Sequence, residues 1–244
     1  MIVMPSNSTG WFWHVLARET GRLGHLFSPG AQRGPWPWFP YALDNGAFSC
    51  WDMATNTFDN EKWAQTEKAW RGLMYWARNA TQQPIWAIVP DVPGNAGRTI
   101  GQWTQYAGLV VGQGFAPAVA VQDGMTVDDV KRLTPQPVVV CVGGTTEWKW
   151  STVEMWKRHF ARVHVLRVNS PDVLHRLELL GIESCDGTGW NRGDKRQTNG
   201  LEYWARDVGK MKPHNSFIAS FTCREPRKKD KQKQTDWAWT FLND

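Results

Sequence analysis

The sequence predicts an α/β protein with a single (β/α)8 barrel domain, and three observations carry this prediction. Its 244 residues suit one barrel domain and require no second one. Short apolar runs of strand length alternate with helix-like segments, which is typical of a parallel sheet. Five apolar runs end in motifs that carry a carboxylate, an amide or a glycine pair. In a barrel such junctions open onto one face, so they would converge on one pocket, and this pattern predicts an enzyme.

Seven strands are expected with good support, and an eighth has two candidates. The seven are residues 1–5, 40–44, 84–90, 116–122, 137–142, 164–168 and 182–185. The run 84–90 is apolar throughout, which suits a strand buried on both faces. Residues 25–29 or 216–222 could supply the eighth strand. A doubly wound open sheet is the alternative, but the Gly-rich phosphate fingerprint expected at its first turn is missing, so a barrel is favoured.

Helix-like segments lie between most of these strands. They are residues 11–20, 59–79, 99–112, 127–133, 151–162, 170–180 and 201–210. Ser151 begins one of them, with Glu154 at the spacing of a capping box. Gly181 is expected to end another. Residues 27–40 are rich in Gly, Pro and Trp, so we expect an irregular loop there.

Composition limits the class of protein. A hydrophobic fraction of 41% with 21% charged residues argues against global disorder. No basic segment followed by an apolar stretch begins the chain, and no run approaches about 18 apolar residues, so a cytoplasmic protein without a membrane partner is expected. The four cysteines are widely spaced without a CxxC pair, which favours a reduced compartment and no zinc cluster. No metal and no cofactor are expected.

Positive charge is concentrated near the C-terminus. The net charge of +5 is compatible with a polyanionic partner, and residues 224–233 hold six Lys and Arg against two Asp and Glu. We expect a barrel domain over residues 1–223 and a basic extension over 224–244. A second cluster follows the last motif directly, and a solvated surface is the alternative interpretation of both. The candidate phosphate-binding residues are Arg192, Lys195, Arg196, Arg227, Lys228 and Lys229. Of the 17 Trp, some could stack on bases, but core filling is favoured for most.

Two aspartates at expected strand ends are the candidate catalytic residues. Asp44 and Asp186 are both followed by small residues, which leave room for a substrate. One carboxylate can attack an anomeric carbon while the other handles protons, as in retaining glycosyl transfer. Asp-Asn and Asp-Gly are also common turn dipeptides, so a turn is the alternative for either residue alone.

A second set of residues has the chemistry of base recognition. The carboxylate of Asp91 can accept from the N1–H and the exocyclic amine of guanine, and an amide such as Gln122 can donate to O6. Backbone N–H groups of Gly143 and Gly144 can do the same. Such a buried set would strongly penalise a base without the matching edge. The alternatives are a tight turn at the glycine pair and a loop glutamine satisfied locally.

The ordered set of motifs resembles the tRNA-guanine transglycosylase superfamily, barrel enzymes that exchange guanine for 7-deazaguanine bases. Residues 44–49 (DNGAFS) are similar to the family's Asp-Ser-Gly-Gly-Phe-Gln motif. Asp91 and the Val-Gln-Asp-Gly segment around Gln122 resemble its guanine-holding aspartate and Val-Gln-Gly segment. The pair 143–144 resembles its Gly-Gly pair, and residues 164–186 resemble the segment that leads to its nucleophile. The resemblance spans residues 44–194.

The resemblance implies a role for each matched residue. Asp186 would be the nucleophile and Asp44 the acid/base group, while Phe48 and Leu166 would sandwich the base. The residues implied in substrate binding are Asp91, Gln122, Gly143, Gly144, Asn45, Phe48 and Leu166. Asn45 stands where the family has Ser, Ser49 stands where it has Gln, and the C-terminal zinc cluster of the tRNA enzymes has no counterpart. These departures resemble the compact phage-associated branch that modifies DNA.

Four functions stay open at this point. The first is a DNA guanine transglycosylase that inserts a 7-deazaguanine, with DNA and the free base as partners. The second is a tRNA enzyme on a reduced scaffold, and the third is a non-catalytic nucleic-acid-binding subunit of such an enzyme. The fourth is a DNA glycosidase that releases guanine and lets water complete the reaction. Two candidate active-site carboxylates argue against the third, and the oligomeric state is left open.

Overall fold

The computed structural model describes residues 1–6, 10–31, 35–52, 54–192 and 195–206, with no side chains for 191–192, and it confirms the predicted barrel. Eight strands form one parallel sheet in the order β1-β10-β9-β8-β7-β6-β3-β2. Their bounds are β1 Ile2–Pro5, β2 His25–Phe27, β3 Tyr41–Leu43, β6 Ala87–Ile88, β7 Pro117–Val121, β8 Val139–Val142, β9 Val163–Val165 and β10 Ser184–Gly187. Neighbours in the sheet therefore follow the order of the chain.

The two edge strands, β1 and β2, meet and close the barrel. Parallel bridges join Val3 to Leu23 and Ser6 to Leu26. The Val3 N–H donates to the Arg22 carbonyl at 2.9 Å, and the Val3 carbonyl accepts from the N–H of Gly24 at 2.9 Å. Because all strands are parallel in a closed ring, their carboxyl ends share one end of the barrel.

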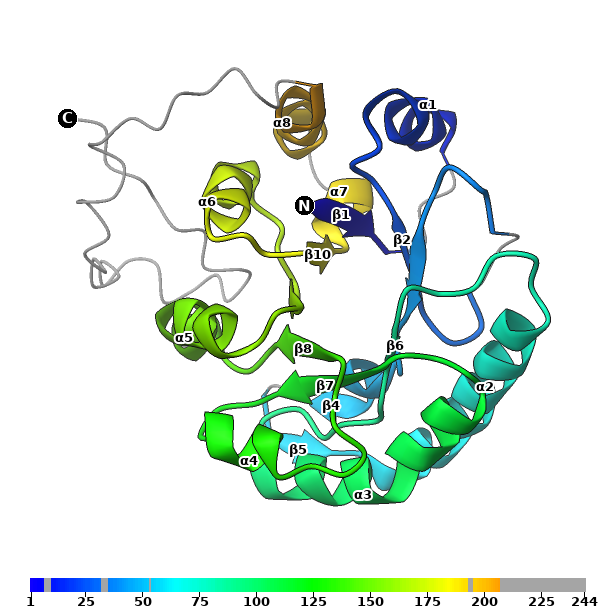
Figure 1. Cartoon of the computed structure of the whole chain (residues 1–244), viewed down its shortest axis with the longest axis vertical. Helices are drawn as coiled ribbons and strands as arrows, with labels where there is room; N and C mark the ends of the chain where they lie inside the picture. Colours follow the sequence, from blue (N-terminus) through cyan, green and yellow to red (C-terminus); the bar gives the residue numbers. More distant parts are fainter. Residues whose placement is uncertain (7–9, 32–34, 53, 193–194, 207–244) are drawn as a thin grey trace.

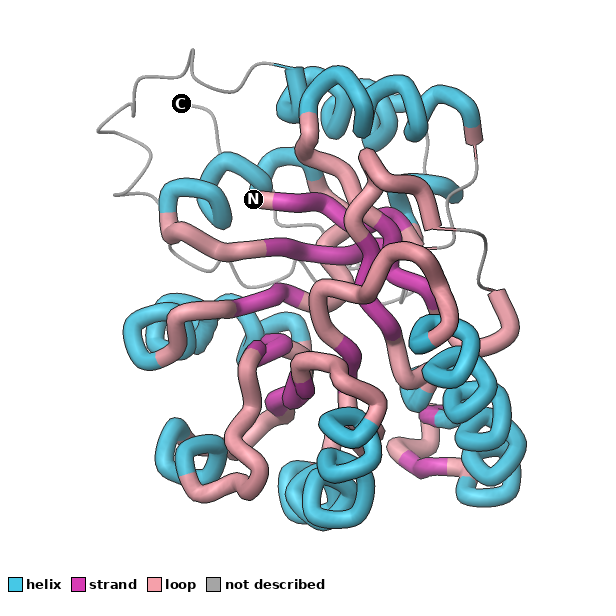
Figure 2. Tube along the Cα trace, turned by 45° about the vertical axis from the view of Figure 1, so that its right-hand side comes forward, coloured by secondary structure: helices cyan, strands magenta, loops and turns pink. Residues whose placement is uncertain are grey.

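Helices surround the sheet, as Figures 1 and 2 show. They are α1 Trp11–Thr20, α2 Asn60–Arg78, α3 Ala96–Gly112, α4 Val127–Lys131, α5 Thr146–His159, α6 Leu174–Leu179, α7 Gly189–Arg192 and α8 Lys195–Arg206. No described helix follows β2, where the expected irregular loop leads to β3. A 3₁₀ turn (Ala47–Cys50) and a small hairpin of β4 (Trp51–Asp52) and β5 (Thr57–Phe58) come before α2, and the sequence did not predict that hairpin.

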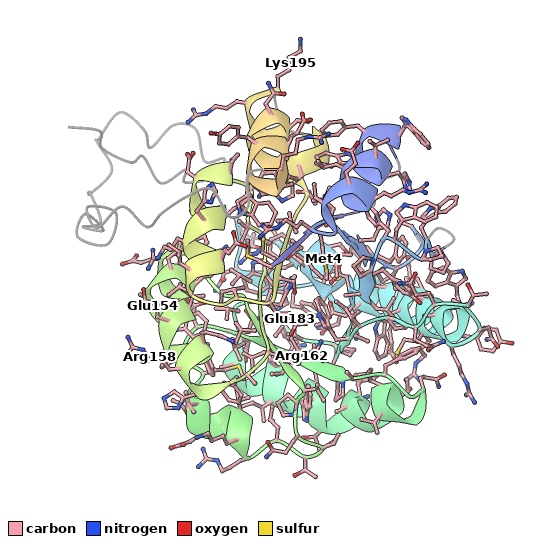
Figure 3. The ribbon with its side chains drawn as sticks, turned by 45° about the horizontal axis from the view of Figure 1, so that its top comes forward. Met4, Glu154, Arg158, Arg162, Glu183 and Lys195 are labelled. Carbon is pink, nitrogen blue, oxygen red and sulfur yellow. The ribbon has the colours of Figure 1, made fainter. Side chains whose placement is uncertain are left out.

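Tryptophan fills much of the interior, as the composition suggested. Six Trp are among the largest fully buried side chains; they are Trp70, Trp86, Trp103, Trp156, Trp190 and Trp204. Most of them pack between the sheet and the helices. Inside the barrel a second apolar cluster includes Trp86 and Met4, and Figure 3 labels Met4 near the middle of the molecule. The barrel is therefore a packed core and not a channel.

An ion pair lies at the amino-terminal end of the strands. Arg162 precedes β9 and Glu183 precedes β10, and both are labelled in Figure 3. The Arg162 Nε and Nη2 atoms each donate to a Glu183 oxygen at 2.7 Å. The end of the barrel away from the aspartates thus has a bidentate charge pair that fixes two adjacent strands.

Several element boundaries differ from the prediction. The eighth strand comes from the 25–29 region, while the rival segment 216–222 and the domain boundary at 223 lie outside the described residues. Helix α5 begins at Thr146, so the prediction that Ser151 begins it was wrong. Thr145 is the cap, because its hydroxyl accepts from the Trp148 N–H. Helices α3 and α8 also begin earlier than predicted.

The corrected start of α5 can be tested with a pair of substitutions. Thr145→Ala should lower the free energy of unfolding by about 0.5–2 kcal/mol, because it removes the cap. Ser151→Ala, at an exposed position inside the helix, should change it by less than about 0.5 kcal/mol. Urea denaturation measures both. Equal losses, or a larger loss for Ser151→Ala, would contradict this boundary.

Candidate active site

Three aspartates meet at the carboxyl end of the barrel. Asp44 follows β3 directly, Asp91 lies shortly after β6, and Asp186 lies in β10, where it is paired with Met4 of β1. Burial raises the pKa of both Asp44 and Asp91, and the charge of Asp186 adds to the shift of Asp44 as the charge of Asp44 adds to that of Asp91. The barrel therefore gathers three carboxylates from distant parts of the sequence into one acidic cluster.

Asp91 is buried and held by two amide side chains. Its Oδ1 accepts from Asn45 Nδ2 at 2.8 Å, and its Oδ2 accepts from Gln122 Nε2 at 2.6 Å. Burial raises the pKa of Asp91 to about 7, and the charge of Asp44 adds to this, while the Asn45 bond and the charge of Arg167 oppose it. The carboxylate keeps lone pairs that can accept further hydrogen bonds from a ligand.

The side-chain amides of Asn45 and Gln122 differ in the hydrogen-bond donors that remain for a substrate. Asn45 donates through Nδ2 to Asp91 and to the Val89 carbonyl at 3.0 Å, and its Oδ1 accepts from a backbone N–H. Both of its amide hydrogens are used within the described residues, so Asn45 positions Asp91. Gln122 donates one hydrogen to Asp91 and accepts from the Gly94 N–H at 3.3 Å. Its second amide hydrogen has no acceptor among the described residues.

The glycine pair has one N–H group available. The Gly143 N–H donates to the Val121 carbonyl at 3.1 Å, which leaves Gly144 as the candidate donor to a base. Within the described part of the chain the Gly144 N–H makes no hydrogen bond. Gly144 has φ +72°, and a Cβ there would lie 2.3 Å from an oxygen of Asp123. The tight turn that the sequence left as an alternative is thus present, and a residue with a side chain would be strained there.

Asp44 is set up to hold a proton. It is half-buried, and its Oδ2 accepts from the Ser28 hydroxyl at 3.1 Å. Burial is the main cause that raises its pKa, followed by the charge of Asp186, while backbone and hydroxyl donors oppose the shift. A raised pKa favours the protonated form of this carboxyl group, which is the form that a general acid needs.

Asp186 has one oxygen engaged and one open. Its Oδ1 accepts from the Arg167 N–H at 3.0 Å and is 3.1 Å from Nε2 of His164. Its Oδ2 receives no hydrogen bond from the described residues. No function was predicted for His164 from the sequence, although a histidine inside an apolar strand is a signal that could have indicated one. The environment of Asp186 suits a nucleophile that is oriented but not blocked.

Arg167 covers part of the expected base-binding surface, a contact that the sequence did not predict. Its guanidinium lies 4.7 Å from the ring centroid of Phe48, which is exposed, and it donates to the Gly144 carbonyl. Leu166 lies against Gly143, where a Cβ would be 3.2 Å from its Cδ1. A base that stacks on the ring face of Phe48 next to Arg167 would therefore have to displace the Arg167 side chain.

A buried lysine fixes the loop that carries Arg167. Lys149 of α5 is only 3% exposed, and its Nζ donates to the carbonyls of Leu166 at 2.9 Å and Arg167 at 3.2 Å. Arg167 has φ +58°, a left-handed conformation that is uncommon for a residue with a side chain. The two bonds from Lys149 hold the backbone in this conformation and so aim the Arg167 N–H at Asp186.

The predicted phosphate-binding residues are only partly described. Lys195 and Arg196 are exposed in the first turn of α8, and Figure 3 shows Lys195 projecting away from the end of the helix. Gln197 donates to the Asn169 carbonyl at 3.0 Å, so this turn lies beside the loop after β9, at the same end as Asp186. The side chain of Arg192, and Arg227, Lys228 and Lys229 as a whole, lie outside the described residues.

The described residues provide neither a metal centre nor a membrane span. Among them, no three or more His, Cys, Asp or Glu side chains are grouped so that they could hold a metal ion. None of the described helices has the length and apolar character needed to cross a membrane. The acidic cluster is thus the candidate site that the geometry provides.

Comparisons with known proteins do not assign a family. No protein-family model matches the chain, and no curated protein matches it. The resemblance to transglycosylases therefore stays a prediction from the motifs, and the function has to be argued from the site.

The raised pKa of Asp91 predicts a pH-dependent stability. The folded protein binds the Asp91 proton more tightly than the unfolded chain, whose pKa is about 3.9. The contribution of Asp91 to the free energy of unfolding should therefore fall as the pH rises from about 4 to about 7 and stay constant above that. Asp91→Asn should remove this fall, so the variant gains stability relative to the wild type as pH rises. Urea denaturation of both proteins across this pH range tests the prediction. Free energies of unfolding that change with pH in parallel for the wild type and Asp91→Asn would contradict it.

Proposed function

We propose that the protein is a DNA guanine transglycosylase, which exchanges guanine in DNA for a 7-deazaguanine base through a covalent aspartyl–deoxyribose intermediate. One observation carries the proposal. Asp44 and Asp186 belong to the same acidic cluster, but burial and charge favour the protonated form of Asp44, while Asp186 has an open oxygen. Two carboxyl groups with different environments can share the roles of acid and nucleophile.

The proposed reaction is a double displacement without oxidation or reduction. The Asp186 carboxylate forms an ester bond to C1′ of deoxyguanosine as the bond from C1′ to N9 breaks. The electron pair leaves on N9, and Asp44 supplies the proton that neutralises the departing guanine. The incoming base then loses its N9 proton to Asp44 and attacks C1′, which releases the Asp186 carboxylate. Two inversions at C1′ retain its configuration.

The base-recognition residues support this assignment. In the ionised form, Asp91 can accept from the N1–H and the exocyclic amine of guanine. The Gly144 N–H and the second amide hydrogen of Gln122 are the donors left for O6. A 7-deazaguanine has the same edge, so one pocket can bind the leaving and the incoming base. A base without that edge would leave buried groups unpaired, at a cost of about 1–3 kcal/mol for each group.

The position of the acidic cluster at the end of the barrel explains why the enzyme would need to bind the phosphate backbone. A target base must leave the DNA stack to reach the end of a barrel, and this unstacking costs a few kcal/mol. Lys195 and Arg196 lie at that end and can bind phosphates beside the flipped nucleotide. Arg192, Arg227, Lys228 and Lys229 are proposed to add further contacts. A tRNA enzyme with the same chemistry is the alternative that the first experiment decides.

Asp186→Asn should abolish the exchange, because an amide in place of the carboxylate does not attack C1′. Asn fits this position, since one oxygen can accept both hydrogen bonds that Oδ1 now accepts. Asp44→Asn should slow turnover by about 10²–10⁴-fold while DNA binding persists. The measurement is mass analysis of nucleosides from DNA and from tRNA after co-expression with enzymes that make a 7-deazaguanine.

Asp128→Asn, at an exposed position of α4, is the control and should leave the exchange unchanged. Retained exchange in Asp186→Asn would contradict the assignment of the nucleophile. Modified nucleosides in tRNA but not in DNA would establish the alternative substrate.

The salt dependence of DNA affinity tests the phosphate contacts. The logarithm of the association constant should fall linearly with the logarithm of salt concentration. Lys195→Gln combined with Arg196→Gln should lower that slope by roughly 0.7–0.9 for each phosphate that the variant no longer neutralises, without changing which base is exchanged. Lys131→Gln, in the last turn of α4, is the control. An unchanged slope would exclude the start of α8 from the DNA interface.

A further inference from the structure

A chain of three polar side chains runs through the otherwise apolar interior at the nucleophile. Ser184 Oγ lies 2.8 Å from Nδ1 of His164, and Nε2 of His164 lies 3.1 Å from Oδ1 of Asp186. Ser184 and Asp186 are two residues apart in β10 and point to the same face, and His164 of β9 pairs with Ser184 in register. His164 and Ser184 have no exposed surface, and Asp186 is 6% exposed.

Hydrogen-bond chemistry fixes the form of the imidazole ring. The proposed nucleophile acts as an ionised carboxylate, which can only accept, so in that state the hydrogen between the two groups belongs to Nε2 of His164. A neutral ring then has an acceptor at Nδ1, and the Ser184 hydroxyl is its donor. The indole ring of Trp86 packs edge-on against the imidazole, with centroids 4.7 Å apart. Two hydrogen bonds and this contact leave the ring one orientation.

The same three residue types occur in hydrolase triads, but the arrangement here excludes that function. In such a triad the serine attacks the substrate, so the substrate must be able to reach its hydroxyl. The histidine contacts that hydroxyl through the ring nitrogen opposite the aspartate. Ser184 is completely buried, whereas Asp186 is the member of the chain nearest the carboxyl end of the strands. The chain therefore acts on the aspartate and not on the serine.

We infer that His164 is a positioning residue that sets which oxygen of Asp186 attacks C1′, and that Ser184 keeps His164 in the required tautomer. The inference rests on the proposed function. The His164 Nε2–H and the Arg167 N–H both converge on Oδ1 and so fix the rotation of the carboxylate. Oδ2 is left as the attacking oxygen. A nucleophile held in its reactive orientation avoids an entropic cost at each turnover.

A matched pair of variants separates orientation from packing. In His164→Gln the amide nitrogen can take the place of Nε2 and still donate to Asp186. In His164→Asn the shorter amide reaches Ser184 but not Asp186. Both variants bury one neutral amide in place of the ring, so a role in packing alone would affect them similarly.

The experiment measures covalent adduct formation in a single turnover on a guanine-containing DNA oligonucleotide, after denaturation. His164→Asn should slow adduct formation and kcat by up to about 100-fold, because a small misplacement of a reacting group can cost about that much, with DNA affinity unchanged. His164→Gln should restore most of the rate. Ser184→Ala should fall between His164→Asn and the wild type, because the ring loses its tautomer lock but keeps its donor.

The wild-type protein distinguishes failure of the proposed function from failure of this inference. A wild type that forms no adduct would contradict the proposed function itself. A wild type that forms the adduct while His164→Asn forms it equally fast would overturn the inference and leave the proposed function standing. Nitrogen NMR of His164 gives a readout without activity. The inference requires the Nε2–H tautomer and a shift of that nitrogen in Asp186→Asn, and an Nδ1–H tautomer would overturn it even where a variant fails to fold.

Discussion

The end of the barrel is organised by the need to bury carboxyl groups close together. A buried carboxylate without hydrogen-bond partners is costly, and neighbouring negative charges add to the cost. Each of the three aspartates has a different solution: two amides for Asp91, a hydroxyl and backbone N–H groups for Asp44, and an imidazole with one backbone N–H for Asp186. These hydrogen-bonding partners come from neighbouring strands and the loops after them. The same hydrogen bonds that stabilise the aspartates therefore also hold these loops together.

The barrel interior beneath the cluster strengthens these interactions. Met4, Trp86 and small apolar residues fill it, and charges beside a packed apolar layer are screened less than in water. The same layer explains why Asp44 and Asp91 have raised pKa values although both accept hydrogen bonds. The packing that stabilises the fold therefore also raises the pKa of two of the three acids at the site.

The sequence predicted the barrel and the aspartates because both leave local patterns, namely alternating elements and polar motifs at strand ends. It did not predict the role of His164, because the residue faces Ser184 only through strand register, which no local pattern records. Arg167 was missed since nothing in its neighbours signals a left-handed backbone. Helix α5 was placed too late because Ser151 with Glu154 has the spacing of a capping box, whereas the actual cap is Thr145, whose hydroxyl accepts from the Trp148 N–H.

The left-handed backbone of Arg167 has a consequence for how this protein would change under selection. A residue with a side chain is less stable in that conformation than glycine by about 1–2 kcal/mol. Glycine at this position would relieve the strain and would keep the N–H that Asp186 accepts, but it would remove the guanidinium that covers Phe48. Selection for thermal stability alone would therefore drive position 167 toward glycine, whereas under the proposed function selection for control of access to the base would retain the strained arginine.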